Sequence, residues 1–139
     1  MAGDEARQSA QRLILIVEDN ELNLKLLKDV IEYHGYATVV TGFGEVAIDL
    51  AHQHQPDLIL LDMQLADISG LDVARRLKAD PQTRAIPIVA VTAFAMSGDR
   101  AKSIESGCND YVAKPFRMWK FWNSSLVILA HLQQIRRDD

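Results

Sequence analysis

Residues 13–20 read LILIVEDN, five apolar residues followed by two acids and an asparagine. A continuous apolar run this short, rich in isoleucine and valine, is typical of a strand buried on both faces of a sheet. Asp19 or Asn20 is suited to cap a helix that follows the strand. Residues 21–34 carry apolar side chains at helical spacing, and Gly35 is the expected stop. The stretch therefore predicts a buried strand that leads directly into an amphipathic helix.

The same strand-and-helix unit recurs along the rest of the chain. Further strands are predicted at residues 37–40, 57–61, 86–93 and 110–113, and further helices at 45–54, 71–79, 97–105 and 116–133. Apolar strands that alternate with amphipathic helices indicate a parallel sheet covered on both faces. We therefore expect an α/β fold, a single doubly wound sandwich in which the βα unit occurs five times.

Length, composition and charge limit the classes of protein to consider. The 139 residues, 48% hydrophobic and 24% charged, suit one globular domain, and a net charge of −4 disfavours nucleic acid as a partner. The single cysteine, Cys108, forms no internal disulfide, and no apolar run is long enough to span a membrane, so we expect a cytoplasmic protein. We expect residues 1–12 to be a flexible tail and residues 13–135 to form the domain, with no output domain after it.

Polar residues follow the predicted strands where a parallel α/β sheet places its working site, beyond the carboxyl ends of the strands. They are Glu18, Asp19, Asp62, Thr92 and Lys114. Clustered carboxylates repel one another unless a hard cation such as Mg²⁺ lies between them. A metal, a carboxylate nucleophile, a lysine and a threonine together indicate phosphoryl transfer. No Walker-type phosphate loop is present, so the phosphoryl group is expected from another molecule.

Five segments resemble the receiver domains of response regulators, over nearly all of residues 13–132. They are VEDNELN (17–23), PDLILLDMQL (56–65), SGLDV (69–73), IPIVAVTAFAM (86–96) and YVAKP (111–115). The resemblance is closest to single-domain regulators of the DivK type, which act in cell division and cell fate. It implies a flavodoxin-like (βα)5 fold with the strand order 2-1-3-4-5.

The resemblance implies a phosphoacceptor, Asp62, and a cofactor, Mg²⁺. The implied metal ligands are the carboxylates of Asp19 and Asp62, that of Glu18 through a water, and the backbone carbonyl of Gln64. The implied donor is a sensor histidine kinase or a histidine phosphotransfer protein. By this reading the domain is not an enzyme, but a phosphoacceptor that assists its own phosphorylation and dephosphorylation.

The resemblance also implies how the phosphoryl group is held and how its presence is read out. The implied contacts come from the Thr92 and Lys114 side chains and from the backbone N–H groups of Met63 and Ala93. Thr92 and Tyr111 are the implied switch residues. Their movement would change a surface made by the fourth helix, the fifth strand and the fifth helix, which a downstream kinase or regulator protein would bind.

The predicted last helix carries two apolar stripes, which is more than one core requires. Trp119, Trp122 and Leu126 are the candidate contact residues, and tryptophan is enriched at binding hot spots. We expect this helix to dock a partner protein or a second copy of the chain, as a homodimer. The alternative is that these side chains only pack within the domain.

Two other functions remain open at this point. One is an interaction module that works without phosphorylation, against which the intact set of polar residues argues. The other is a small phosphohydrolase with an aspartyl nucleophile. That class usually has a second acid two residues after the nucleophile, whereas Gln64 stands there and cannot transfer a proton as an acid does.

Overall fold

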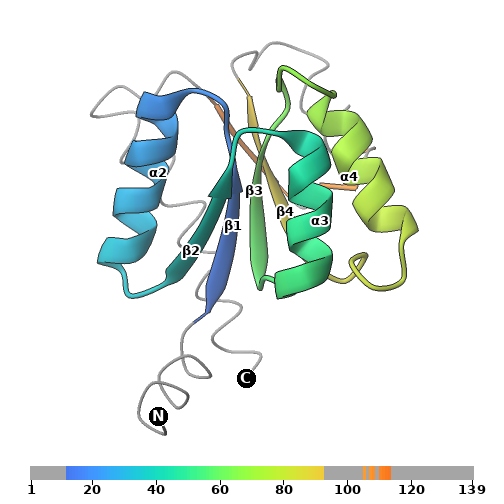
Figure 1. Cartoon of the computed structure of the whole chain (residues 1–139), viewed down its shortest axis with the longest axis horizontal. Coiled ribbons are helices and arrows are strands. Elements are labelled where there is room, and N and C mark those ends of the chain that lie inside the picture. Colours follow the sequence, from blue (N-terminus) through green and yellow to red (C-terminus); the bar gives the residue numbers. More distant parts are fainter. Residues whose placement is uncertain (1–11, 93–104, 106, 109, 114–139) are drawn as a thin grey trace, which may run out of the picture.

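The chain folds as a parallel β-sheet with helices on both faces (Figure 1). The computed structural model describes residues 12–92, 105, 107, 108 and 110–113, and only the backbone of 92 and 110–113. The strands are β1 (Leu13–Val17), β2 (Ala37–Thr41), β3 (Leu58–Asp62), β4 (Ile88–Thr92) and β5 (Asp110–Ala113), in the order β2-β1-β3-β4-β5. All neighbouring strands are parallel.

The described helices are α2 (Glu21–Tyr33), α3 (Gly44–His54) and α4 (Gly70–Ala79). Each follows a strand, as the alternating pattern predicts, and the expected order of the first four strands is confirmed. Several expectations lie outside the described residues: the helix at 97–105 except for its last residue, the helix at 116–133, and the predicted roles of the Ala93 backbone N–H and of Lys114, Trp119, Trp122 and Leu126.

Both faces of the sheet are apolar because both are covered. In β1, Ile14 and Ile16 pack toward α2, where they meet Leu27. The alternate residues Leu15 and Val17 point to the other face and pack in one cluster with side chains of α3 and α4. The strand therefore needs apolar side chains at every position, which is why it reads as a continuous run.

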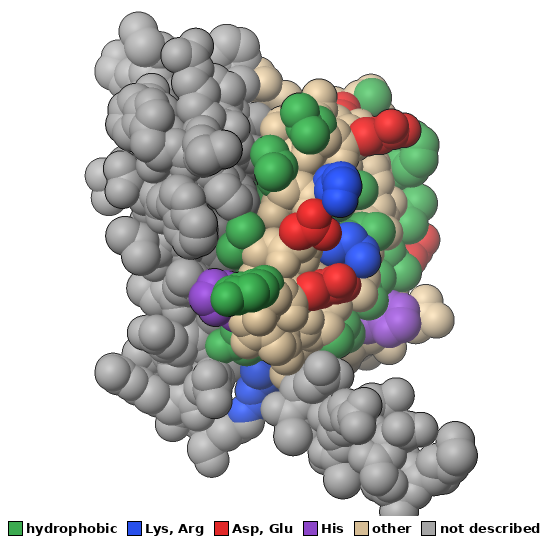
Figure 2. All heavy atoms as spheres, turned by 90° about the vertical axis from the view of Figure 1, so that its left-hand side faces the viewer, with side chains coloured by type: hydrophobic (Ala, Val, Ile, Leu, Met, Phe, Trp, Pro, Cys, Tyr) green, Lys and Arg blue, Asp and Glu red, His purple; other side chains and the backbone are tan. Residues whose placement is uncertain are grey.

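The outward face of α2 is charged and faces the viewer in Figure 2. Lys25 pairs with Asp29 and Lys28 with Glu32, each at 3.1 Å and each four residues apart. Acidic and basic side chains accordingly alternate over this face, with a few exposed apolar ones among them (Figure 2). The helix thus combines a buried apolar stripe with a solvated stripe held by ion pairs.

The prediction of a strand from residue 86 is wrong, because β4 begins at Ile88. Pro87 has no N–H to donate to a ladder, and Ile86 is engaged in the preceding turn, where its N–H donates to the Thr83 carbonyl at 3.0 Å. The Pro87 carbonyl still accepts from the Ile59 N–H at 3.0 Å. Hydrogen bonding to β3 therefore begins with the Pro87 carbonyl, and the regular pairing of the two strands begins one residue later, at Ile88.

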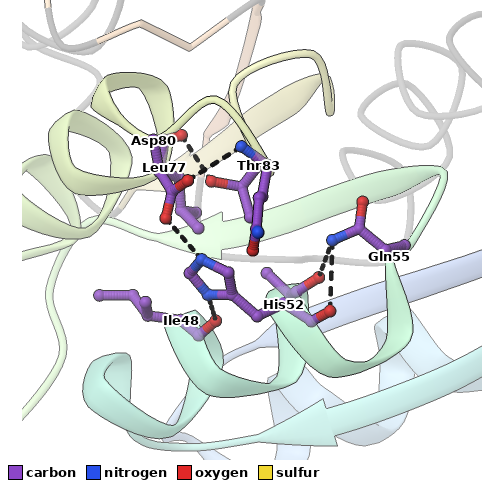
Figure 3. Close-up of polar contacts among 8 residues, drawn as sticks. Ile48, His52, Gln55, Leu77, Asp80 and Thr83 are labelled. Atoms are coloured by element: carbon purple, nitrogen blue, oxygen red, sulfur yellow. Dashed lines mark hydrogen bonds and ion pairs between the residues drawn. The ribbon is translucent and has the colours of Figure 1, made fainter.

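Helices α3 and α4 are joined near their carboxyl ends by His52 and Asp80 (Figure 3). Nε2 of His52 lies 2.5 Å from Asp80 Oδ2, and Nδ1 lies 3.0 Å from the Ile48 carbonyl oxygen. Both partners are acceptors, so the doubly protonated ring satisfies both contacts. Two hydrogen bonds raise the pKa of His52: the one to the Asp80 carboxylate has the larger effect, and the one to the Ile48 carbonyl the smaller. The pKa of Asp80 is lowered chiefly by the hydrogen bond from the Gln82 N–H, and to a smaller extent by His52.

This pair predicts a pH-dependent contribution to stability. Because the folded-state pKa of His52 is raised, its contribution is complete below the unfolded-state value of about 6.5 and is lost as the pH rises through the folded-state value. Thermal unfolding of His52→Gln should therefore show the largest loss of Tm at about pH 6 and a shrinking loss toward about pH 9. His54→Gln, at an exposed position of the same helix, is the control. A loss that is equal at all pH values would contradict the assignment.

Candidate functional site

Three carboxylates meet at the carboxyl ends of β1 and β3. The register pairs Val17 with Leu61, so Glu18 and Asp62 leave their strands side by side. Ligand oxygens of Glu18, Asp19 and Asp62 all lie within 4.8 Å of one another. Glu18 and Asp62 are each 1% exposed, whereas Asp19 is exposed. The cluster therefore has a buried floor and one side open to solvent.

Glu18 is held inward by the turn between β1 and α2. Its N–H donates to the Thr41 carbonyl at 3.0 Å, which continues the pairing with β2. Its Oε2 accepts from the Asn20 N–H at 3.1 Å. Asn20 is the N-cap of α2, since its Oδ1 accepts from the Asn23 N–H at 2.9 Å. The chain thus passes from strand to helix within a few residues and leaves both acids at the sheet edge.

Asp62 is oriented by the residue two positions later. The Gln64 N–H donates to Asp62 Oδ1 at 3.0 Å. The Met63 N–H, which was expected to face a phosphoryl group, instead donates to the Val91 carbonyl at 2.9 Å, as part of the pairing with β4. Alternate backbone groups of a strand point to opposite sides. The N–H directed at the Asp62 carboxylate is therefore that of Gln64 and not that of Met63.

The loop between β3 and α4, residues 63–69, closes on itself beside the cluster. Gln64 pairs with Ser69 in an antiparallel bridge, and the Gly70 N–H donates to the Met63 carbonyl at 3.1 Å. A Cβ on Gly70 would lie 2.3 Å from the Asp62 carbonyl oxygen and 2.5 Å from Met63 Cα. Only glycine allows α4 to start this close to the end of β3.

Sequence reasoning missed Asp67, which lies in the same loop. Its Oδ1 accepts from the Gly44 N–H at 2.9 Å and its Oδ2 from the Glu45 N–H at 3.0 Å. Both hydrogen bonds lower the pKa of Asp67, and the one from the Glu45 N–H has the larger effect. The only signal in the sequence is indirect: Phe43 precedes α3 and has no oxygen with which to cap it.

The strand ends also place the backbone of the remaining predicted residues. Asp62 pairs with Val91, and Thr92 pairs with Ala113, so the chain at 62, 92 and 113 reaches the same edge of the sheet. Tyr111 pairs with Ala90 inside the sheet. The side chains of Thr92 and Tyr111, and the whole of Lys114, lie outside what the structure describes.

Comparison with known proteins identifies the class to which this fold and site belong. The family model for the response regulator receiver domain matches residues 14–123, so the chain belongs to this family. Among similar proteins, the polar-differentiation response regulators DivK of Brucella ovis and Brucella abortus are each 52% identical to it over 108 residues, covering 78% of this chain and 88% of DivK. The chain is thus a signalling domain rather than an enzyme, and its function is phosphorylation-dependent signalling.

Solved receiver domains support the same fold. The receiver domain of the sensor histidine kinase PA1611 from Pseudomonas aeruginosa, with a magnesium ion coordinated in its active-site cleft, has a TM-score of 0.77 and 31% identity, covering 90% of this chain and 98% of that one. The Mn²⁺-bound response regulator Rcp1 has a TM-score of 0.72 and 26% identity, covering 81% and 87%. Carboxylate oxygens suit hard divalent cations, so the acidic cluster fits such an ion.

One negative finding concerns membranes. Within the part of the chain that the structure describes, none of the helices is both long and apolar enough to cross a bilayer.

Gly70 provides a test of the loop geometry. Gly70→Ala places a methyl group against the backbone of Asp62 and Met63, which cannot move without disturbing β3. We expect the free energy of unfolding in urea to fall by about 1–3 kcal/mol. Gly42→Ala is the matched control, because its Cβ would meet Asp19 Cα at an ordinary 3.4 Å. Equal effects of the two substitutions would show that the close approach at Gly70 does not constrain the loop.

Proposed function

We propose that this chain is a phosphoacceptor switch in which Asp62 takes a phosphoryl group from a phosphohistidine partner in the presence of Mg²⁺. The observation that carries the proposal is the cluster of Glu18, Asp19 and Asp62, whose oxygens lie within 4.8 Å of one another at the edge of the sheet. In a parallel α/β sheet this edge, at the change of strand order, is where ligands bind. The similarity to DivK supports a role in cell-cycle or developmental control.

The residues at this edge are suited to hold Mg²⁺. Asp19 and Asp62 would bind directly, Glu18 through a water, and the Gln64 backbone carbonyl would complete the protein ligands. The exposed Asp19 leaves a path for the ion and for the phosphoryl donor. When bound, the ion neutralises negative charge on the oxygens of the transferring group. The same ion relieves the repulsion between the buried carboxylates.

The transfer itself is a displacement at phosphorus. An Asp62 carboxylate oxygen attacks, the bond between phosphorus and the partner's histidine nitrogen breaks, and an acyl phosphate forms on Asp62. The Gln64 N–H, which donates to Asp62 Oδ1 at 3.0 Å, orients the carboxylate. The Thr92 hydroxyl, the Lys114 ammonium group and the Ala93 N–H contact the phosphoryl oxygens.

The new group adds about 1.5 to 2 negative charges at the sheet edge. Thr92 and Tyr111 respond to it and alter the surface formed by β5 and its neighbouring helices, which a downstream kinase or regulator protein reads. Trp119, Trp122 and Leu126 in the last helix contact such a partner or a second copy of the chain. In this proposal the receiver domain spans residues 13–135 with five βα units, and the protein works in the cytoplasm.

Phosphorylation provides the direct test. Incubated with Mg²⁺ and acetyl phosphate, or with a phosphorylated histidine kinase, the chain should gain one phosphoryl group by intact-protein mass spectrometry. Asp62→Asn and added EDTA should each abolish the gain, while Asp72→Asn, which alters an exposed carboxylate of α4, should not. Continued turnover of a phosphoester would indicate a phosphohydrolase. No reaction with any donor would leave an interaction module.

Metal binding provides a second test. Because like charges are forced together, Asp19→Asn should leave the metal-free protein at least as stable as the wild type in thermal unfolding. The wild type should gain Tm as Mg²⁺ is added, since a ligand bound only to the folded state stabilises it. Asp19→Asn should lose most of that gain. A gain of equal size in both proteins would place the cation elsewhere.

A further inference from the structure

Helix α3 is capped by a residue that is distant in the sequence. The N–H groups of a first helical turn need acceptors, and Phe43 at the N-cap position offers no side-chain oxygen. Asp67 supplies both acceptors, to Gly44 at 2.9 Å and to Glu45 at 3.0 Å. The carboxylate comes from the loop between β3 and α4, which is the loop that contains Gln64.

We propose that Asp67 is a positioning residue for the divalent-cation site, because it fastens the 63–69 loop to α3 and so fixes the Gln64 carbonyl where the cation binds. The inference rests on the proposed function, in which that carbonyl is a metal ligand. Asp67 itself does not touch the cation or the phosphoryl group. Its effect reaches the site through the backbone of the loop.

The loop is also closed at its base by backbone pairing. This pairing is the antiparallel bridge between Gln64 and Ser69, which includes the hydrogen bond from the Gly70 N–H to the Met63 carbonyl. Asp67 stands two residues before Ser69, which lies opposite Gln64 in the bridge, so the loop backbone connects Asp67 to Gln64. Leu65 and Ile68 of the loop also pack against the core, and among the described hydrogen bonds the two from Asp67 are those that join the outer part of the loop to a separate helix.

Packing at the start of α3 supports the same attachment. A Cβ on Gly44 would lie 2.6 Å from Ile68 Cγ1 and 2.8 Å from Val73 Cγ2. The helix start and the loop are therefore in direct contact, and the absence of a side chain at residue 44 allows it. This contact offers a way to loosen the loop that leaves every charge and every hydrogen-bonding group in place.

The charges around Asp67 favour the contact as well. Its lowered pKa keeps the carboxylate ionised, and an anion is stabilised at a helix N-terminus. Glu45, whose N–H donates to Asp67, pairs through its own carboxylate with Arg76 of α4 at 2.8 Å. Helix α4 directly follows the loop. The contacts therefore connect the loop to α3 through Asp67, and α3 to α4 through Glu45 and Arg76.

The test is the Mg²⁺ dissociation constant of the full chain, measured by isothermal titration calorimetry without any phosphodonor. Asp67→Ala should raise Kd about tenfold, the usual scale for removing a group that orients a metal ligand. Asp67→Asn keeps one acceptor oxygen, so its Kd should lie between the values of Asp67→Ala and the wild type. Asp72→Ala removes an equal charge from the first turn of α4 and should bind as the wild type does.

Two further variants separate positioning from general stability. Gly44→Ala keeps Asp67 and both N–H groups but displaces Ile68, so it should weaken Mg²⁺ binding in the same direction. His52→Gln loosens α3 from α4 at the opposite end, away from the loop. It should lower Tm and leave Kd unchanged, with every titration done well below the Tm of the variant.

The outcomes distinguish this inference from the function on which it rests. If the wild type binds Mg²⁺ and Asp67→Ala binds with the same Kd, the positioning role is wrong and the metal site stands. If His52→Gln weakens binding as much as Asp67→Ala, Asp67 acts only through stability and the inference is again wrong. If the wild type does not bind Mg²⁺, both the metal site and the positioning role are wrong.

Discussion

The structure depends on the burial of two carboxylates, Glu18 and Asp62, next to each other at the ends of adjacent strands. Burying like charges opposes folding, so the surroundings must hold both groups in place. Backbone N–H groups do this at each of them, from Asn20 to Glu18 and from Gln64 to Asp62. The oxygens of Glu18, Asp19 and Asp62 lie close enough together to hold a divalent cation, which would offset this repulsion.

The rest of the fold keeps these strand ends together and reachable. β1 and β3 are neighbours at the centre of the sheet, and apolar packing on both faces prevents either strand from shifting. Helix α3 is joined to the 63–69 loop near the site through Asp67, and to the end of α4 on the far side through His52 and Asp80. The loop that contains Gln64 is thus held both by its own bridge and by the start of α3.

Much of this arrangement was predictable from local pattern. Continuous apolar runs identified β1 and β3, and the acids that follow them were expected at one edge of the sheet. The prediction was wrong where local chemistry competes with pattern: Ile86 is apolar but belongs to a turn, because Pro87 cannot donate to the ladder. Hydrophobic pattern also carries no information on which backbone group pairs with β4, so it did not show that the Met63 N–H donates to the Val91 carbonyl.

By itself the sequence determined the order of strands and helices and the carboxylates that end β1 and β3, because periodicity and residue type are local properties. Only the tertiary structure decided which groups form hydrogen bonds with these carboxylates and with the loop that follows β3. Asp67 caps a helix that starts more than twenty residues earlier, and His52 meets an acid on another helix. Such pairs depend on how the elements pack in space. Contacts between elements that are distant in the sequence produce no periodic pattern of residues along the chain.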